Sequence, residues 1–543
     1  MGSFKAIHAF VAKREKTLAI MSVGAVVVIF VILCATQISR WSMWFDESFT
    51  HYLIRFNMFD ITRYTMLDVH PPLFYWMLKL WSLMFGTSDV ALRSMSVFFG
   101  VVVIVLGFLL ARRLFGKKVG YLSLPLLGLS PMLLRYSIET RMYTMVAMIA
   151  LAQILVLIKA RADGRRRWWI AYGVLVAAGM WTHYYTALVV LAQWAWLFVV
   201  SHKKLGEMFG FARGQKITWR GFWQQIFRVK TGNFLQALFV AVVLFAPWLL
   251  MMVKQLTTVV SGGFWASPVG LGTLPDLLAT TFLYQLSSTT TGWLAAGLIV
   301  LIVGVIYLFV KLWREQLTTT LRQNLLLISL SCVLPPLLLM IISLPPLRSS
   351  FVDRYVLGAI MLAPIMLAIV VGLSRQTIVK NFLYVLTIVL LISGMGAVVY
   401  FGNYNKTTNL ISTAKSLMVK IADNSDGRTI PVIADTAWTF YDADAYATSR
   451  QPVYFLNSQM EDYYYGVEKI LATSPNKIVG LNKWTSQHHI LQVWYISATN
   501  NATKLPPELG SDKSRWTPLR TIRVVAPNDW GGSSNAVLYE INH

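Results

Sequence analysis

Two adjacent carboxylates, Asp46 and Glu47, stand among aromatic residues just after the first apolar run of the chain. Charged groups beside hydrocarbon are costly and often mark functional sites in membrane proteins. A carboxylate can remove the proton of a hydroxyl, and a second one can raise its pKa by like-charge repulsion or bind a polar substrate. We therefore predict a chemical site at this pair. Polar residues that only face the membrane interface are the alternative.

Two arginines, Arg348 and Arg354, follow a double proline late in the chain. A guanidinium group can bind a phosphate through two parallel hydrogen bonds. Long basic side chains also extend toward lipid headgroups without any other role. Both interpretations stay open for this pair.

The composition indicates which elements must position these groups. Of 543 residues, 56% are hydrophobic and 13% are charged, with a mean hydropathy of +0.57. These values are typical of a multi-pass membrane protein. The two cysteines, Cys34 and Cys332, lie in apolar runs, so a disulfide framework and a cysteine metal site are both excluded.

The first membrane span is predicted at Leu18 to Thr36, because its length suits a spanning helix and no cleavage site clearly follows. Ten further apolar runs bring the expected total to about eleven helices. They lie near residues 89–111, 119–134, 142–158, 168–181, 184–200, 233–252, 293–312, 324–344, 355–373 and 381–401.

The distribution of charge predicts the orientation. Loops on the side of the amino terminus hold 25 Lys and Arg, against about nine in the opposite loops. Basic loops stay in the cytoplasm, so the amino terminus is expected inside and the carboxyl terminus outside. The net charge of +24 therefore reflects topology and contact with membrane lipids, and not nucleic-acid binding. The basic and aromatic segment 201–230 fits a helix on the inner membrane surface.

The chain divides into two predicted parts. Residues 1–401 form an all-α polytopic membrane domain, with outer loops at 37–88 and 253–292. In the first loop, Leu73 to Phe85 follows two prolines and is expected to form a helix along the membrane interface. Residues 402–543 carry a net charge of +1 and alternate short strands with helices, so a small extracytoplasmic α/β domain is expected.

Five motifs in order give the chain a family resemblance. It resembles the GT-C superfamily of polyprenyl-phosphate-sugar-dependent glycosyltransferases, in the branch of protein O-mannosyltransferases and aminoarabinose transferases. The motifs are Asp46-Glu47, His70-Pro-Pro-Leu-Phe-Tyr-Trp76, Ser130-Pro131 with Arg135-Tyr-Ser-Ile-Glu139-Thr-Arg141-Met-Tyr143, Trp181-Thr-His183-Tyr184-Tyr185, and Phe351-Val-Asp353-Arg354-Tyr355-Val356.

The resemblance implies transfer of a mannose or pentose-like sugar from a polyprenyl phosphate to a protein, lipid or cell-envelope glycan outside the cytoplasmic membrane. The leaving phosphate needs little acid catalysis, so one base suffices for a single inverting displacement. Asp46 is the expected base, with Glu47 and Glu139 as further catalytic acids. Donor contacts are expected from His70, Arg135, Arg141, Tyr143, His183, Tyr184, Arg348, Asp353 and Arg354.

Simpler roles remain open for several of these residues. His70 can be a helix-start residue, and a neutral histidine is a weaker phosphate clamp than a cation. Glu139 can form a local ion pair with a neighbouring arginine. His183 can belong to an aromatic belt at the membrane interface. No required cofactor is expected, and no ligand spacing indicates a divalent cation, although His70, His183 and the three acids could converge on one.

Two other functions compete with monosaccharide transfer. A transporter or flippase for a lipid-linked sugar would show internal repeats and charges near the membrane midplane, whereas the acids here gather on one side. A lipid-linked oligosaccharide ligase or polymerase would require a pyrophosphate donor. The external domain is expected to recognise a glycan or acceptor.

Overall fold

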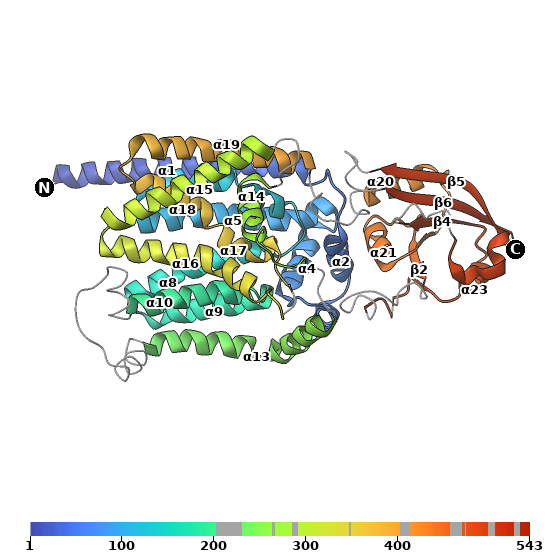
Figure 1. Ribbon diagram of the computed structural model, residues 1–543. Helices are drawn as coiled ribbons and strands as arrows, with labels where there is room; N and C mark the ends of the chain where they lie inside the picture. The colour runs from blue at the N-terminus through green and yellow to red at the C-terminus, as the bar shows by residue number, and fades with distance from the viewer. Residues whose placement is uncertain are drawn as a thin grey trace.

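The computed structural model describes residues 2–201, 231–262, 266–284, 291–315, 317–346, 349–401, 413–456, 470–472, 474–497, 505–525 and 533–542. A long helical bundle leads into a smaller domain built on a sheet (Figure 1). The amino terminus lies at the far end of the bundle, and the sheet domain lies at the other end.

The bundle is built from apolar helices that run along its length. Eight helices in the described residues are long and apolar enough to cross a membrane. They are α1 (Gly2–Gln37), α5 (Asp89–Phe115), α8 (Tyr143–Asp163), α13 (Thr231–Gly262), α15 (Thr291–Glu315), α16 (Thr319–Ile341), the run of η1 (Asp353–Val356), α17 (Leu357–Ile360) and α18 (Ala363–Leu373), and α19 (Thr377–Phe401).

The other three predicted spans coincide with shorter helices. These are α6 (Lys117–Gly128), α9 (Arg166–Thr182) and α10 (Thr186–Ser201). The short helix α7 (Pro131–Ser137) follows α6. Small residues let such helices approach closely. A Cβ atom at Gly173 of α9 would lie 2.4 Å from the carbonyl oxygen of Ala237 in α13, so these two helices pack backbone against backbone.

The first outer loop folds into three short helices between α1 and α5. They are α2 (Phe45–Leu53), α3 (Met58–Thr65) and α4 (Leu73–Phe85). Helix α3 begins where the Asn57 side chain accepts a hydrogen bond from the Asp60 amide, and α4 begins after Pro72. The predicted helix at Leu73 to Phe85 is thereby confirmed.

The segment 253–292, predicted as the second outer loop, contains helical structure. Helix α13 continues to Gly262, and α14 (Thr273–Leu283) lies within the segment. Leu, Val and Thr residues with few charges extend the helical pattern beyond residue 252, which explains the longer helix. The segment 201–230, expected on the inner membrane surface, lies outside the described residues except for Ser201.

The end of the bundle that carries the amino terminus also carries basic loop residues. Glu15 of α1 forms ion pairs with Arg112, at 2.6 Å, and with Lys117. The helices of the first outer loop lie at the opposite end, beside the sheet domain (Figure 1). The predicted basic side and the predicted chemical side are therefore the two ends of one bundle.

The carboxyl-terminal domain is a mixed six-stranded sheet with helices. Strand order is β3-β2-β1-β4-β6-β5, with parallel pairs from β3 to β4 and antiparallel pairs among β4, β6 and β5. The strands are β1 (Val432–Ala434), β2 (Val453–Leu456), β3 (Lys477–Ile478), β4 (Gln492–Ser497), β5 (Trp516–Val525) and β6 (Ser533–Ile541). The helices are α20 (Ala414–Asp423), α21 (Ala437–Asp444), α23 (Leu481–Gln487) and η3 (Pro507–Arg515).

This mixed α/β domain agrees with the fold class expected from the sequence. The sequence predicts six strands here, and each has a counterpart in the sheet; the predicted ranges are 429–434, Val453–Leu456, 477–481, 491–497, 520–525 and 537–541. The predicted boundary at residue 402 lies outside the described residues, as does most of the helix predicted near 460–473.

Candidate active site

Helix α2 places its two acidic residues in its first turn, where negative charge stabilises a helix. The two side chains then point into different surroundings. Asp46 keeps 24% of its side chain exposed, whereas Glu47 is fully buried. Adjacent positions on a helix point about 100° apart, so this separation follows from helix geometry.

Two buried arginines approach the Asp46 carboxylate. Arg141 Nε lies 3.8 Å from Asp46 Oδ2, and Arg354 Nη2 lies 4.0 Å from the same oxygen. Arg141 also donates hydrogen bonds to Thr50 Oγ1 and Tyr75 Oη, both at 3.1 Å. Its buried Nε makes no hydrogen bond within the described residues. The site thus pairs one accessible carboxylate with two fixed cations, one of which retains a donor.

Aromatic rings surround the second arginine. Arg354 Nε donates to Tyr143 Oη at 2.9 Å, and its guanidinium carbon lies 5.3 Å from the Trp44 ring and 5.6 Å from the Tyr355 ring. Contacts at this range stabilise a desolvated cation through the ring faces. Arg354 is therefore held in one position beside Asp46.

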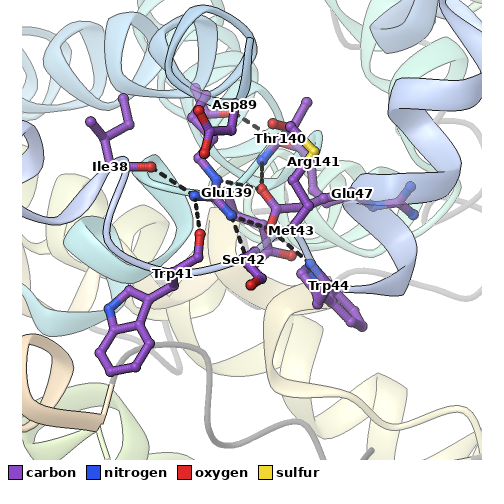
Figure 2. A network of polar contacts seen from close by, with 12 residues as sticks. Ile38, Trp41, Ser42, Met43, Trp44, Glu47, Asp89, Glu139, Thr140 and Arg141 are labelled. Atoms are coloured by element: carbon purple, nitrogen blue, oxygen red, sulfur yellow. Dashed lines mark hydrogen bonds and ion pairs between the residues drawn. The ribbon is translucent and has the colours of Figure 1, made fainter. Parts of the chain in front are cut away.

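Glu47 has a different environment from the one expected of a catalytic acid. Arg93 Nε and Nη2 donate to its two carboxylate oxygens at 2.8 Å each. The Thr140 amide donates to Glu47 Oε1 at 2.8 Å (Figure 2). Arg93 also donates to the carbonyls of Ile38, Trp41 and Ser42. Both carboxylate oxygens of Glu47 are therefore occupied and buried, an arrangement that favours positioning of α2, and its expected catalytic role stays a prediction.

Glu139 and Arg135 form a second internal pair. Arg135 Nη1 lies 2.9 Å from Glu139 Oε2, and the two side chains are 1% and 0% exposed. The local ion pair, one of the two roles weighed for Glu139, is therefore the arrangement found. The catalytic role expected of Glu139 and the donor contact expected of Arg135 stay predictions.

A cavity of about 220 Å³ lies next to Arg354 and the aromatic rings. It is smaller than the roughly 300–1,000 Å³ of pockets for drug-sized ligands, which suits a phosphate or a single sugar. Tyr355 connects it to Arg354. The cavity is lined by Val69, His70, Pro71, His183, Tyr184, Tyr185, Met252, Gln255, Leu256, Ser350 and Tyr355.

The two predicted histidines meet at this cavity, with ring centroids 5.6 Å apart. His70 Nδ1 lies 3.3 Å from Asp68 Oδ2. Burial, with the nearby charges of His70, Arg141 and Arg354, lowers the pKa of His183 well below its ordinary value. His183 Nδ1 accepts from the Tyr185 amide, so its proton sits on the buried Nε2, which has no partner in the described residues.

Two other residues predicted to contact the donor lie near this cavity or beside Arg354. Tyr184 lines the cavity and accepts a hydrogen bond from Trp248 Nε1 at 2.7 Å. Asp353 accepts from the Tyr136 hydroxyl and from the Arg354 amide, so it orients Arg354 at the start of its helix. Arg348 lies outside the described residues.

Within the described residues, no group of three or more His, Cys, Asp or Glu side chains is placed to hold a metal ion. The proposed convergence of His70, His183 and the three acids does not occur there. Glu47 and Glu139 are instead bound by arginines.

Sequence reasoning missed two partners in the site. Arg93 is a charged residue inside a predicted span, one turn after Asp89, which is an expensive position and so a usable signal. Trp44 faces Arg354, and its role depends on a residue more than 300 positions away, so no local pattern could reveal it.

Comparison with known proteins agrees with this architecture. Residues 69–214 match the family described as dolichyl-phosphate-mannose-protein mannosyltransferase. No curated protein matches the chain. ArnT from Cupriavidus metallidurans in the apo state superposes with a TM-score of 0.58 at 11% identity, covering 97% of this chain and 98% of ArnT.

Two further solved structures are similar. ArnT from Cupriavidus metallidurans bound to undecaprenyl phosphate gives a TM-score of 0.53 at 11% identity, covering 96% of this chain and 98% of that one. The oligosaccharyltransferase AglB from Archaeoglobus fulgidus gives a TM-score of 0.46 at 12% identity, covering 96% of this chain and 74% of AglB.

The apolar helices and these similarities identify a multi-pass membrane protein. The chain shares the GT-C glycosyltransferase fold of ArnT, and its residues 69–214 match the mannosyltransferase family model, which confirms the resemblance seen in its sequence.

Proposed function

We propose that the protein transfers a monosaccharide, mannose or a pentose-like sugar, from a polyprenyl phosphate to a hydroxyl acceptor by a single inverting displacement. The observation that carries this proposal is the accessible Asp46 carboxylate held beside two buried arginines. The GT-C fold, and the undecaprenyl phosphate bound by the similar ArnT structure, support a lipid-phosphate donor.

Asp46 acts as the base in this reaction. It takes the proton of the acceptor hydroxyl as the oxygen attacks the anomeric carbon of the donor. Arg141 and Arg354 lie within 4.0 Å of its carboxylate and stabilise the negative charge that grows on the departing phosphate. Their position is fixed before the reaction by Tyr75, Thr50 and Tyr143.

The cavity beside Tyr355 holds the donor headgroup. The Nε2–H of His183 is a buried donor without a partner in the described residues, and it lines this space. As a neutral group it contributes a hydrogen bond rather than a charge, so the arginines carry the electrostatic part of phosphate binding. His70 and Tyr184 complete the wall.

The reaction takes place on the outer face of the cytoplasmic membrane. The excess of basic residues at the amino-terminal end supports a cytoplasmic amino terminus, which puts α2 and the carboxyl-terminal domain outside. The acceptor is a protein, a lipid or a cell-envelope glycan. No cofactor is required, and no nucleic acid is bound.

The test uses purified full-length protein in lipid nanodiscs with radiolabelled polyprenyl-phosphate mannose and polyprenyl-phosphate pentoses. Extracted membranes and envelope proteins serve as acceptors. Release of free polyprenyl phosphate with label in an acceptor supports the proposal. A protein that moves the lipid across the bilayer without cleaving it is a transporter, and one that reacts only with pyrophosphate donors is a ligase or polymerase.

Asp46→Asn is the matched variant in this assay. Asp276→Asn serves as the control, because Asp276 is an exposed carboxylate in the first turn of α14. Transfer by the Asp46→Asn variant at the normal rate would remove Asp46 as the base.

A further inference from the structure

The carboxyl-terminal domain packs directly on the helix that carries Asp46. The Tyr441 ring of α21 meets Phe45 at 5.8 Å, Phe49 at 5.5 Å and Tyr52 at 5.1 Å between ring centroids, each nearly perpendicular. Edge-to-face packing of this kind fixes relative orientation as well as burying apolar surface. Figure 1 shows α21 facing α2 across the junction of the two domains. One face of α2 thus belongs to the interface with this domain.

Polar contacts fix the register of this interface. Arg55 Nη1 lies 2.7 Å from Asp444 Oδ2, and Arg55 Nη2 donates to the Asp444 carbonyl at 2.9 Å. The Met43 amide donates to Tyr446 Oη at 2.7 Å, just before α2 begins. These contacts hold both ends of α2 from the side of the domain.

One acid in the interface lacks any such partner. Asp442 is 2% exposed, and neither of its carboxylate oxygens has a hydrogen-bond partner in the described residues. The Ser48 hydroxyl faces it without reaching the geometry of a full hydrogen bond. The charged groups that act on it from α2 are the carboxylates of Glu47 and Asp46, and neither is a cation. An ionised carboxylate is therefore unfavourable at this position.

We propose that the carboxyl-terminal domain is a working part of the catalytic centre, in which the buried Asp442 carboxyl is a positioning residue that controls the docking of α21 on α2 and through it the position of Asp46. The catalytic meaning of this inference rests on the proposed glycosyl transfer. The docking of α21 on α2 does not depend on that reaction, so docking and catalysis can be tested separately.

The chemistry of Asp442 makes docking sensitive to pH. Burial, with repulsion from Glu47 and Asp46, raises the pKa of Asp442 to about 8. In the undocked state the carboxyl is exposed and has its ordinary pKa of about 4. The docked state therefore binds one more proton between these values, and docking weakens about tenfold per pH unit as the pH rises from about 4 to about 8. Above that range the docked carboxyl also ionises and the dependence ends.

Hydrogen–deuterium exchange of the α2 amides measures this directly in the full-length protein. We compare the wild type with Asp442→Asn, which keeps the shape and cannot ionise, at the same pH so that intrinsic exchange rates cancel. From pH 6 to pH 8, protection of α2 in the wild type is expected to fall by up to about 100-fold relative to Asp442→Asn. Parallel protection in the two proteins at both pH values would overturn the proposal.

Asp423→Asn is the matched control for this measurement, since Asp423 is an exposed carboxylate of α20 in the same domain. It should follow the wild type at every pH. A control that matches Asp442→Asn instead would show that the effect comes from net charge and not from the interface, and would also overturn the proposal.

Transfer assays then test the catalytic consequence. Asp442→Ala should lower kcat about tenfold at neutral pH with an unchanged KM for the donor, because Asp442 does not line the cavity, and Asp442→Asn should restore most of the loss. An equal loss in both variants would contradict positioning by an uncharged carboxyl. If no donor is cleaved by any form of the protein, the proposed function fails, while the exchange experiment still decides whether Asp442 controls docking.

Discussion

Glu47 and Arg93 form a buried two-contact ion pair, with both nitrogen–oxygen distances at 2.8 Å, one position away from the partly exposed Asp46. Arg93 links this carboxylate to three carbonyls of the segment that connects α1 to α2. The pair therefore anchors the start of α2 to α5, and this fixes the helix that carries Asp46 beside Arg141 and Arg354.

Replacing the proposed base should remove activity without loosening the fold. Asp46→Asn keeps the size of the side chain but cannot accept a proton from the acceptor, so kcat should fall by about 10²- to 10⁴-fold. The release of polyprenyl phosphate measures this, and the Asp276→Asn control should retain wild-type turnover. A full loss of thermal stability in Asp46→Asn would point instead to a structural role.

Breaking the buried pair should affect stability far more than breaking an accessible one. Glu47→Gln leaves the Arg93 charge buried without its counter-ion, which costs about 3–5 kcal/mol. Glu15→Gln is the comparison, because Glu15 pairs with basic residues in a more exposed setting where such pairs contribute about 0–1 kcal/mol.

The measurement for this pair is the midpoint of thermal unfolding in one detergent at one scan rate, since membrane proteins often unfold irreversibly. We expect a large drop for Glu47→Gln and almost none for Glu15→Gln. Equal drops would mean that the buried pair does not anchor α2.

The two arginines near Asp46 should respond to a change of geometry at constant charge. Arg141→Lys and Arg354→Lys keep the positive charge but lose the planar set of donors that binds phosphate oxygens. Each substitution should lower kcat/KM by about 10- to 100-fold, the range for losing one strong charge-assisted contact. Initial rates across a donor series measure the effect, and Lys254→Arg, at an exposed position on α13, provides the control. Unchanged kcat/KM in both variants would exclude phosphate contact.

Acid should weaken the fold through His183. Its pKa is lowered well below 6.5 in the folded protein, so the unfolded chain binds the additional proton when the pH falls below about 6.5. Stability is then lost as the pH decreases, by up to about 1.4 kcal/mol per pH unit. Comparing thermal midpoints at pH 5 and pH 7.5 tests this.

His183→Gln should show a smaller difference between these two midpoints than the wild type. His488→Gln, at an exposed histidine of the carboxyl-terminal domain, should show the wild-type difference. If His183→Gln also retains the full difference, His183 is not the source.

The elements of this protein could be predicted far better than the roles of its side chains. The helix at Leu73 to Phe85 and the strand at Val453 to Leu456 have the bounds that the sequence indicated, because proline placement and apolar runs act locally. The helix predicted to end near residue 252 continues to Gly262, because weakly polar residues extend α13 instead of ending it.

The division of labour between Asp46 and Glu47 could not be read from the chain. It depends on Arg93, 46 positions after Glu47, and on Arg354, which lies in a late helix. Nothing in the sequence marks Asp442, because aspartate is common in short helices outside membrane spans. Its special environment arises only when tertiary packing buries it. Side-chain chemistry here is decided by partners that only the fold brings together.

The hydrogen bond from the Met43 amide to the Tyr446 hydroxyl joins positions 403 residues apart. A ribosome synthesises Met43 before the later spanning helices and Tyr446 only after them. The helices of the bundle can therefore enter the membrane before the contact that fixes the start of α2 is able to form. The final placement of α2 thus waits for the synthesis and folding of the residues around Tyr446.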